Sequence, residues 1–180
     1  KIRSMANTIA TLRMDLIPAT SELLRAVIES DEALGESLGV SVAEDWTEFG
    51  KAPFEYMLNV LTSDKNQDGW CNYFPILKSG NQLIGSGGFK GGPNADGWVE
   101  IGYEIAPAYR NQGLATEMAM GLIDYALTKV DVTGICAHTL AEENASCEVL
   151  KKCGFVKTGE LEDPDDGLIW RWEWDGSEEN

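Results

Sequence analysis

The sequence predicts an α/β (α+β) protein with a mixed, mostly antiparallel β-sheet and helices on both faces. Segments of alternating apolar and polar residues, bounded by glycine, proline and asparagine, recur along the chain and indicate strands. In the second half, a strand pattern over residues 98–105, a helical pattern up to residue 129 and a strand pattern over residues 135–140 follow one another. Because a strand–helix–strand crossover is right-handed and aligns its two strands, we expect this pair to be parallel.

The first part of the chain predicts one strand and two helices. Residues 8–14 alternate apolar and polar side chains and indicate a strand that is stopped at Pro18. Thr20 or Ser21 can cap a helix whose apolar residues recur at helical spacing. Pro53 suits the first turn of a second helix. Residues 31–48, between these helices, scatter apolar residues among acids and predict no definite element.

Two further pairs of strands are predicted as hairpins. Residues 70–77 and 82–89 are joined by a Lys-Ser-Gly-Asn turn, and residues 155–162 and 168–174 by a Pro-Asp-Asp-Gly turn. The glycines between Gly85 and Gly92 do not predict a phosphate loop, because no helix follows them. Three tryptophans alternate along the last strand and should share one face, as core or interface residues: Trp170, Trp172 and Trp174.

Composition narrows the class of protein. The chain has 180 residues, is 43% hydrophobic and carries a formal net charge of −16, which disfavours nucleic acid and anionic membranes as partners and favours a cationic one. No apolar run would span a bilayer, and the four cysteines lack metal-ligand spacing, so we expect a cytoplasmic protein without a metal site. We expect one domain over residues 5–175, an expression remnant at residues 1–4 and an acidic tail at residues 176–180.

The most informative stretch joins the central strand to the helix after it. Apolar residues alternate from Val99 to Ile105, Pro107 ends the strand, and Arg110-Asn111-Gln112-Gly113-Leu114-Ala115 leads into the helix. The first N–H groups of a helix lack internal partners and lie at the positive end of its dipole, so they can bind a phosphate. Gly113 would let a ligand approach backbone that a Cβ would otherwise cover.

A second motif follows the predicted parallel strand. It begins with the strand residues Ala137 to Leu140. A helix follows that Asn144 can cap and Gly154 can end, and the motif closes with the sequence Lys-Cys-Gly-Phe. Together the two motifs resemble the GNAT N-acetyltransferase superfamily, whose acyl-CoA pyrophosphate loop is written [QR]-x-x-G-x-[GA]. The resemblance is closest to the branch of ribosomal-protein N-terminal acetyltransferases and is strongest over residues 98–155.

The resemblance implies a GNAT-like fold, a reaction and a binding site. The reaction would be direct transfer of an acetyl group from acetyl-CoA to a primary amine, which could belong to a protein N-terminus, a lysine or a small molecule. The loop would hold the pyrophosphate, and the end of the central strand would pair with the pantetheine arm and present one N–H to the oxyanion. The residues so implied are Ile105, Ala106, Pro107, Arg110, Gln112, Gly113, Leu114, Ala115, Thr116 and Asn144.

Two carboxylates on the central strand are candidate general bases. Because side chains alternate between faces, Glu100 and Glu104 lie on one face together, opposite the apolar residues. Glu100 stands where members of the superfamily carry a base that acts through water, whereas Glu104 is nearer the acetyl end. The alternative interpretation is that both are solvated residues of an exposed sheet face.

Ser146 is the candidate acid. Many members of the superfamily have a tyrosine where Leu150 stands here, but the ribosomal-protein branch has a serine at the position of Ser146. A hydroxyl that only satisfies a backbone amide is the alternative. His138, the only histidine, is interpreted as a core residue.

The sequence leaves other functions open. A module that binds CoA without turnover is the first alternative, supported by the missing tyrosine. An interaction domain that dimerises through its tryptophans is the second. The sequence does not identify the acceptor amine, whose pocket the resemblance places within residues 31–64. A homodimer is likewise left open.

Overall fold

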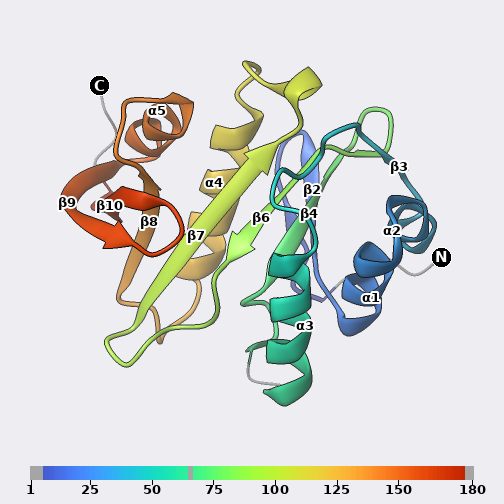
Figure 1. Ribbon diagram of the computed structural model, residues 1–180, viewed down its shortest axis with the longest axis horizontal. Helices are drawn as coiled ribbons and strands as arrows, with labels where there is room; N and C mark the ends of the chain where they lie inside the picture. The colour runs from blue at the N-terminus through green and yellow to red at the C-terminus, as the bar shows by residue number, and fades with distance from the viewer. Residues whose placement is uncertain (1–5, 65–66, 177–180) are drawn as a thin grey trace.

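The computed structural model describes residues 6–64 and 67–176, which form a mixed α/β architecture (Figure 1). The predicted remnant and nearly all of the predicted acidic tail lie outside these residues. The elements, in chain order, are β1 (Ile9–Ala10), β2 (Met14–Pro18), α1 (Ser21–Glu29), α2 (Asp31–Leu38), β3 (Ser41–Val42), α3 (Ala52–Ser63), β4 (Asn72–Leu77), β5 (Gln82–Leu83), β6 (Gly85–Phe89), β7 (Trp98–Ile105), η2 (Pro107–Tyr109), α4 (Leu114–Leu127), β8 (Gly134–Leu140), α5 (Ala145–Lys152), β9 (Phe155–Asp163) and β10 (Gly167–Trp174).

The strands form one sheet in the order β1-β2-β4-β6-β7-β8-β10-β9, with β5 added to β4 and β3 added to β5. Neighbours along the main path are antiparallel except β7 and β8, which are parallel and joined by α4, as the sequence predicts. The two-residue contact between β3 and β5 is also parallel. The predicted mixed sheet is therefore confirmed.

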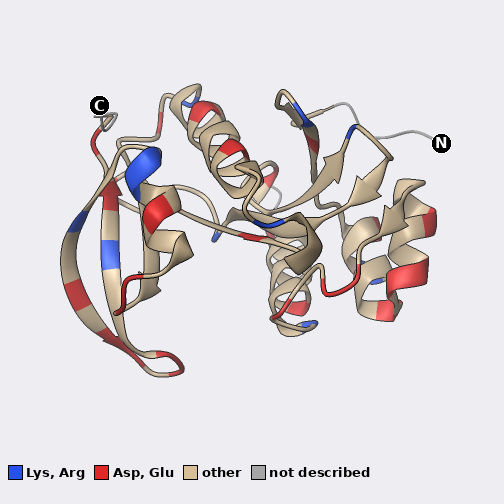
Figure 2. Ribbon diagram, turned by 90° about the horizontal axis from the view of Figure 1, so that it is seen from above, with Lys and Arg blue, Asp and Glu red and all other residues tan. Residues whose placement is uncertain are grey.

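Helices cover both faces of the sheet, also as predicted. In Figure 2 the sheet is seen along its plane, with α4 on one side and α1 and α3 on the other. Helix α4 packs its buried residues, among them Met118 and Leu122, against β7. On the opposite side Phe54 of α3 stacks on Phe74 of β4, with ring centroids 6.1 Å apart. None of the helices in the described part of the chain is long and apolar enough to cross a membrane.

The first strand differs from its prediction. Residues 8–14 form β1 and a tight turn, and the longer strand β2 begins only at Met14. The Thr11 N–H donates to the Met14 carbonyl at 2.8 Å and closes this turn. Apolar alternation runs through the turn unchanged, so periodicity alone could not reveal it. Pro18 ends β2 as its last residue, opposite Tyr73 of β4.

The predicted helix caps are confirmed, and residues 31–48 acquire structure that the pattern did not show. The Thr20 hydroxyl accepts from the Leu23 N–H, and the Asn144 side chain accepts from the Cys147 N–H. Helix α2 and the short strand β3 occupy much of the unassigned region. The chain then crosses the face of the sheet before α3, where Thr47 reaches the central strand.

The C-terminal hairpin forms as predicted and carries the three tryptophans. Trp172 is 2% exposed and donates through its indole N–H to the Thr139 hydroxyl, which makes it a core residue. Trp170 and Trp174 are half-buried and pack against the edge of the same core. The interpretation as core residues therefore holds best for Trp172.

Candidate active site

A cavity opens where β7 and β8 separate. Their parallel pairing runs from Trp98 opposite Gly134 to Glu100 opposite Cys136, and the strands then diverge towards η2 and α5. The gap leads to a cavity of about 590 Å³, which we call the cleft cavity. Its lining comes from the end of β7, the loop before α4, the first turn of α4 and one side of α5 along its length: Tyr103, Glu104, Ile105, Arg110, Asn111, Gly113, Leu114, Ala115, Thr116, Ala145, Ser146, Glu148, Val149 and Lys152.

The predicted pyrophosphate loop forms one wall of the cleft cavity. Gly113 precedes α4 with φ at +77°, a left-handed conformation that glycine adopts without strain. No side chain caps α4, so the first N–H groups of the helix remain available to a ligand. Six of the ten predicted binding residues line the cavity, whereas Ala106, Pro107, Gln112 and Asn144 do not.

Arg110 lies at the mouth of the cleft but is engaged elsewhere. Its Nε donates to the Ile105 carbonyl at 2.9 Å, and its Nη2 donates to the Glu48 carboxylate at 2.8 Å. The pair is exposed, so its contribution to stability is small. A bound phosphate could therefore draw the guanidinium from Glu48 at little cost.

Arg13, in the turn between β1 and β2, supports the loop from the other side. Its Nη1 donates to the Gln112 carbonyl at 2.8 Å, and its Nε donates to the Glu117 carboxylate at 2.8 Å. Glu117 also accepts from the Thr11 hydroxyl and the Arg13 N–H. Burial alone would raise the pKa of Glu117, but these hydrogen bonds outweigh it and lower the pKa below the ordinary value of 4.5.

We expect Glu117→Gln to lower the free energy of unfolding by about 1–2 kcal/mol at pH 7, because charge-assisted hydrogen bonds are lost. A lowered pKa means that the carboxylate stabilises the fold above its unfolded pKa and ceases to do so as the pH falls through the folded value. The melting temperatures of the variant and the wild type should therefore converge as the pH falls below the lowered pKa of Glu117. Asp124→Asn, an exposed residue of the same helix, is the control; an equal loss there would contradict this account.

The end of β7 presents one N–H to the cleft. The Ala106 N–H donates to the Ile84 carbonyl at 2.7 Å and so faces β6, and Pro107 has no N–H. Because successive N–H groups point to opposite edges of a strand, that of Ile105 faces the side from which β8 has departed. Of the three residues predicted at the end of the strand, Ile105, Ala106 and Pro107, it is therefore Ile105 whose N–H faces the cleft.

Ser146 faces a tyrosine that the sequence analysis did not select. Its Oγ lies 3.2 Å from the hydroxyl of Tyr103 on β7, which also donates to the Ser146 carbonyl. Burial raises the pKa of Tyr103, although the hydrogen bond with Ser146 opposes this rise, so the phenol keeps its proton. A single tyrosine on an otherwise aliphatic strand face was the available signal, because a buried phenol needs a polar partner.

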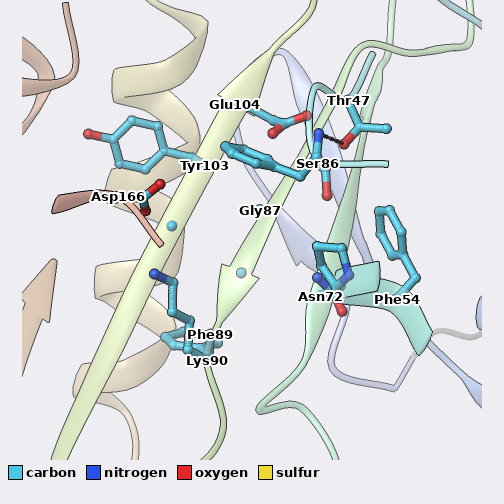
Figure 3. Close-up of a pocket in the computed structure, with 14 residues that line it drawn as sticks. Thr47, Phe54, Asn72, Ser86, Gly87, Phe89, Lys90, Tyr103, Glu104 and Asp166 are labelled. Carbon is cyan, nitrogen blue, oxygen red and sulfur yellow. Dashed lines mark hydrogen bonds between the residues drawn. The ribbon is translucent and has the colours of Figure 1, made fainter. Parts of the chain in front are cut away.

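A second cavity, the face cavity, lies on the opposite side of Tyr103 and has a volume of about 340 Å³ (Figure 3). Its floor is formed by β6 and β7 with Asn72 of β4, and its walls by the segment before α3 and the turn between β9 and β10. Thr47, Phe49, Pro53 and Phe54 line it, and all four belong to the range in which the acceptor pocket was expected.

Glu104 lines both cavities. Burial raises the pKa of its carboxyl group above the ordinary 4.5, while hydrogen bonds from Thr47 and from the Glu48 N–H partly offset the rise. A carboxylate with a raised pKa is a better proton acceptor near neutral pH than an ordinary one. Glu104 therefore combines a position between the cavities with a raised carboxyl pKa.

Glu100 has different surroundings. Its two oxygens pair with Lys90 Nζ at 2.6 Å and His138 Nδ1 at 3.1 Å, and it lines neither cavity. His138 is mostly buried, with 17% of its side chain exposed, and contacts Glu100 from β8. The two carboxylates that the sequence placed on one face are thus distinguished by their partners.

Comparison with known proteins identifies the family of this chain. The profile of the acetyltransferase (GNAT) domain matches residues 13–156. A Bacillus subtilis protein named uncharacterized N-acetyltransferase YjdG is 28% identical over 148 residues, covering 81% of this chain and 88% of that protein.

Solved structures share the fold. The ribosomal-protein-S5-alanine acetyltransferase from Vibrio fischeri has a TM-score of 0.67 at 14% identity, covering 92% of this chain and 94% of that one. The ribosomal L7/L12 alpha-N-protein acetyltransferase RimL, solved with coenzyme A, has a TM-score of 0.66 at 16% identity, covering 92% and 96%. The fold and the match to the domain profile define the class of protein as an acetyltransferase. The chain belongs to the GNAT family and is an N-acetyltransferase of that family.

Proposed function

We propose that this enzyme transfers an acetyl group from acetyl-CoA to a primary amine by direct attack, with the donor in the cleft cavity and the amine in the face cavity. The single observation that carries the proposal is that Glu104 lines both cavities. A carboxylate in that position can accept a proton from an amine that enters from one side while the thioester lies on the other.

The residues of the cleft fit acetyl-CoA. The uncapped start of α4 offers N–H groups to the pyrophosphate, and Gly113 leaves their approach free. The β8-facing edge of β7 offers main-chain groups to the pantetheine arm in the manner of an added strand. When bound, acetyl-CoA supplies the activated acetyl group. Asn144 caps α5 and so contributes by fixing the position of that helix.

The chain's own groups then have separate tasks. Glu104 takes one proton from the ammonium, and the free amine then attacks the thioester carbonyl, where the Ile105 N–H stabilises the negative charge that develops on the oxygen. The nitrogen releases its second proton to solvent. As the carbon–sulfur bond breaks, the Ser146 hydroxyl gives a proton to the sulfur and recovers one from the Tyr103 hydroxyl, 3.2 Å away, while solvent returns a proton to Tyr103 so that the phenol ends the cycle protonated. Glu100 stays a candidate base from the sequence, and its mutant is tested beside that of Glu104.

The proposal is tested by thermal melting with acetyl-CoA and by release of free thiol with a panel of amines. An upward shift in melting temperature is expected from donor binding, and thiol release that depends on the amine shows transfer. A shift without release from any primary amine would contradict the proposal and favour a module that only binds CoA.

Salt dependence gives a further prediction. Acidic residues lie over much of the surface (Figure 2), and the net charge is −16, so a cationic amine should be concentrated near the enzyme. We expect kcat/KM for such an amine to fall as salt rises towards about 1 M, where the Debye length is about 3 Å. An uncharged hydroxylamine-type acceptor is the control. Equal salt dependence for both acceptors would contradict steering.

A further inference from the structure

The face cavity has a floor without side chains at its centre. Gly102 of β7 lies on the same face as Glu104, and a Cβ built there would meet only Lys90 Cε, at 3.7 Å. By contrast, a Cβ at Gly87 or Gly88 would lie 2.6 or 2.2 Å from backbone oxygen. Packing therefore requires glycine at those two positions on β6 but not at Gly102. The absence of a side chain at Gly102 leaves room for a ligand.

Three side chains around this floor offer oxygen atoms as hydrogen-bond acceptors: Glu104, Asp166 and Asn72. Glu104 lies at one end, and Asp166, from the turn between β9 and β10, reaches the cavity beside Tyr103 (Figure 3). Asn72 Oδ1 is buried and has no hydrogen-bond partner among the described residues. A buried oxygen without a partner is rare in folded proteins, so this one indicates a ligand with N–H groups.

The remaining lining is apolar or already paired. Phe49, Phe54 and Phe89 form the apolar walls. Among the described residues that line the cavity, Lys90 has the one cationic side chain, and its Nζ forms an ion pair with Glu100 at 2.6 Å. The cavity thus offers two carboxylates and an amide oxygen around an apolar space, at a volume typical of small-molecule sites.

We infer that the acceptor is a small aliphatic diamine, or an amine with an equivalent second positive charge; this rests on the proposed function. The reacting amine lies at Glu104, the apolar chain crosses Gly102, and the second ammonium group faces Asp166. Gly102 and Glu104 are two residues apart on β7 and are therefore separated by about 6.8 Å, so a chain of a few methylene groups can extend from Glu104 across Gly102. One ammonium group loses a proton to Glu104, forms the new carbon–nitrogen bond as the carbon–sulfur bond of acetyl-CoA breaks, and releases its second proton to solvent. The sulfur leaves as the CoA thiol with a proton from Ser146, and the other nitrogen keeps its charge.

The test compares putrescine with butylamine, which has the same chain and a single amine. The rate of CoA release gives kcat/KM for each amine, and the measured quantity is the ratio of the two values. We expect a ratio of roughly two to five in favour of putrescine, in line with a partly screened ion pair. Asp166→Asn should bring the ratio close to one, and Asp165→Asn, in the same turn but outside the lining, should keep it.

A second variant tests the path across the floor. Gly102→Val places its Cβ in the open space, where the nearest atom is Lys90 Cε at 3.7 Å, and should lower kcat/KM for putrescine by roughly tenfold or more. Calorimetric affinity for acetyl-CoA shows whether the variant is folded. Gly159→Val is the matched control, because a Cβ on that exposed strand meets no atom within 4 Å.

The outcomes separate this inference from the proposed function. Turnover of both amines with a ratio near one, or a ratio unchanged by Asp166→Asn, overturns the inference and leaves amine acetylation intact. A higher kcat/KM for a short peptide that begins with lysine overturns the assignment to a small molecule. Absence of CoA release with every primary amine overturns both.

Discussion

We expect Gly113→Glu to weaken binding of acetyl-CoA by roughly 100-fold or more. The substitution places a side chain and a negative charge in the wall of the cleft cavity, where the pyrophosphate is expected to lie. It also forces a non-glycine residue to adopt φ near +77°, which destabilises the loop geometry. The measurement is the dissociation constant of CoA by calorimetry, together with the melting temperature of the unliganded protein.

Gly80→Glu separates these two effects. Gly80 lies in the turn between β4 and β5 with φ at +86°, and a Cβ there meets no atom within 4 Å. The variant therefore carries similar backbone strain and the same charge away from the cleft. It should lose stability to a similar extent and keep its affinity for CoA. Equal loss of affinity in both variants would mean that strain or net charge, and not the loop, controls binding.

The second large effect is expected from Glu104→Gln, which should lower kcat/KM at neutral pH by about 10²- to 10³-fold. The loss should shrink as the pH rises towards about 10.4, where an alkyl amine is already deprotonated. In the wild type, activity should fall as the pH drops through the raised pKa of Glu104, at a higher pH than an ordinary carboxyl group would give. That acidic limb should be absent from the variant's profile of kcat/KM against pH.

Glu100→Gln is the matched comparison, because it removes the same charge four residues away on the same face of β7. Its carboxylate is paired with Lys90 and His138 and lies outside both cavities. We expect a smaller loss without recovery at high pH. If recovery occurs in Glu100→Gln and not in Glu104→Gln, the base is Glu100, which the resemblance favoured.

Ser146→Ala and Tyr103→Phe test the proton donor. Both should lower kcat without recovery at high pH, because alkaline solution does not supply a proton to the leaving sulfur. Since the two hydroxyls are hydrogen-bonded, the double variant should lose little more than the more impaired single variant. Additive losses would indicate that the hydroxyls act separately.

The sequence by itself determined the local features of this site. Alternation defined β7, Pro107 marked its end, and Gly113 marked the start of α4, because each depends on neighbours in the chain. The cap at Asn144 followed from the same local rules. The order of strand, loop and helix was therefore predictable, and with it the wall of the cleft.

Only the tertiary structure decided what surrounds each side chain. Period-two geometry made Glu100 and Glu104 equivalent, but Lys90 comes from the residue after β6, His138 from β8, and Thr47 from a segment without periodicity. Burial and charge pairing depend on such distant segments, and these set whether a carboxylate is ion-paired or has a raised pKa. The same holds for Tyr103, whose partner Ser146 lies 43 residues away.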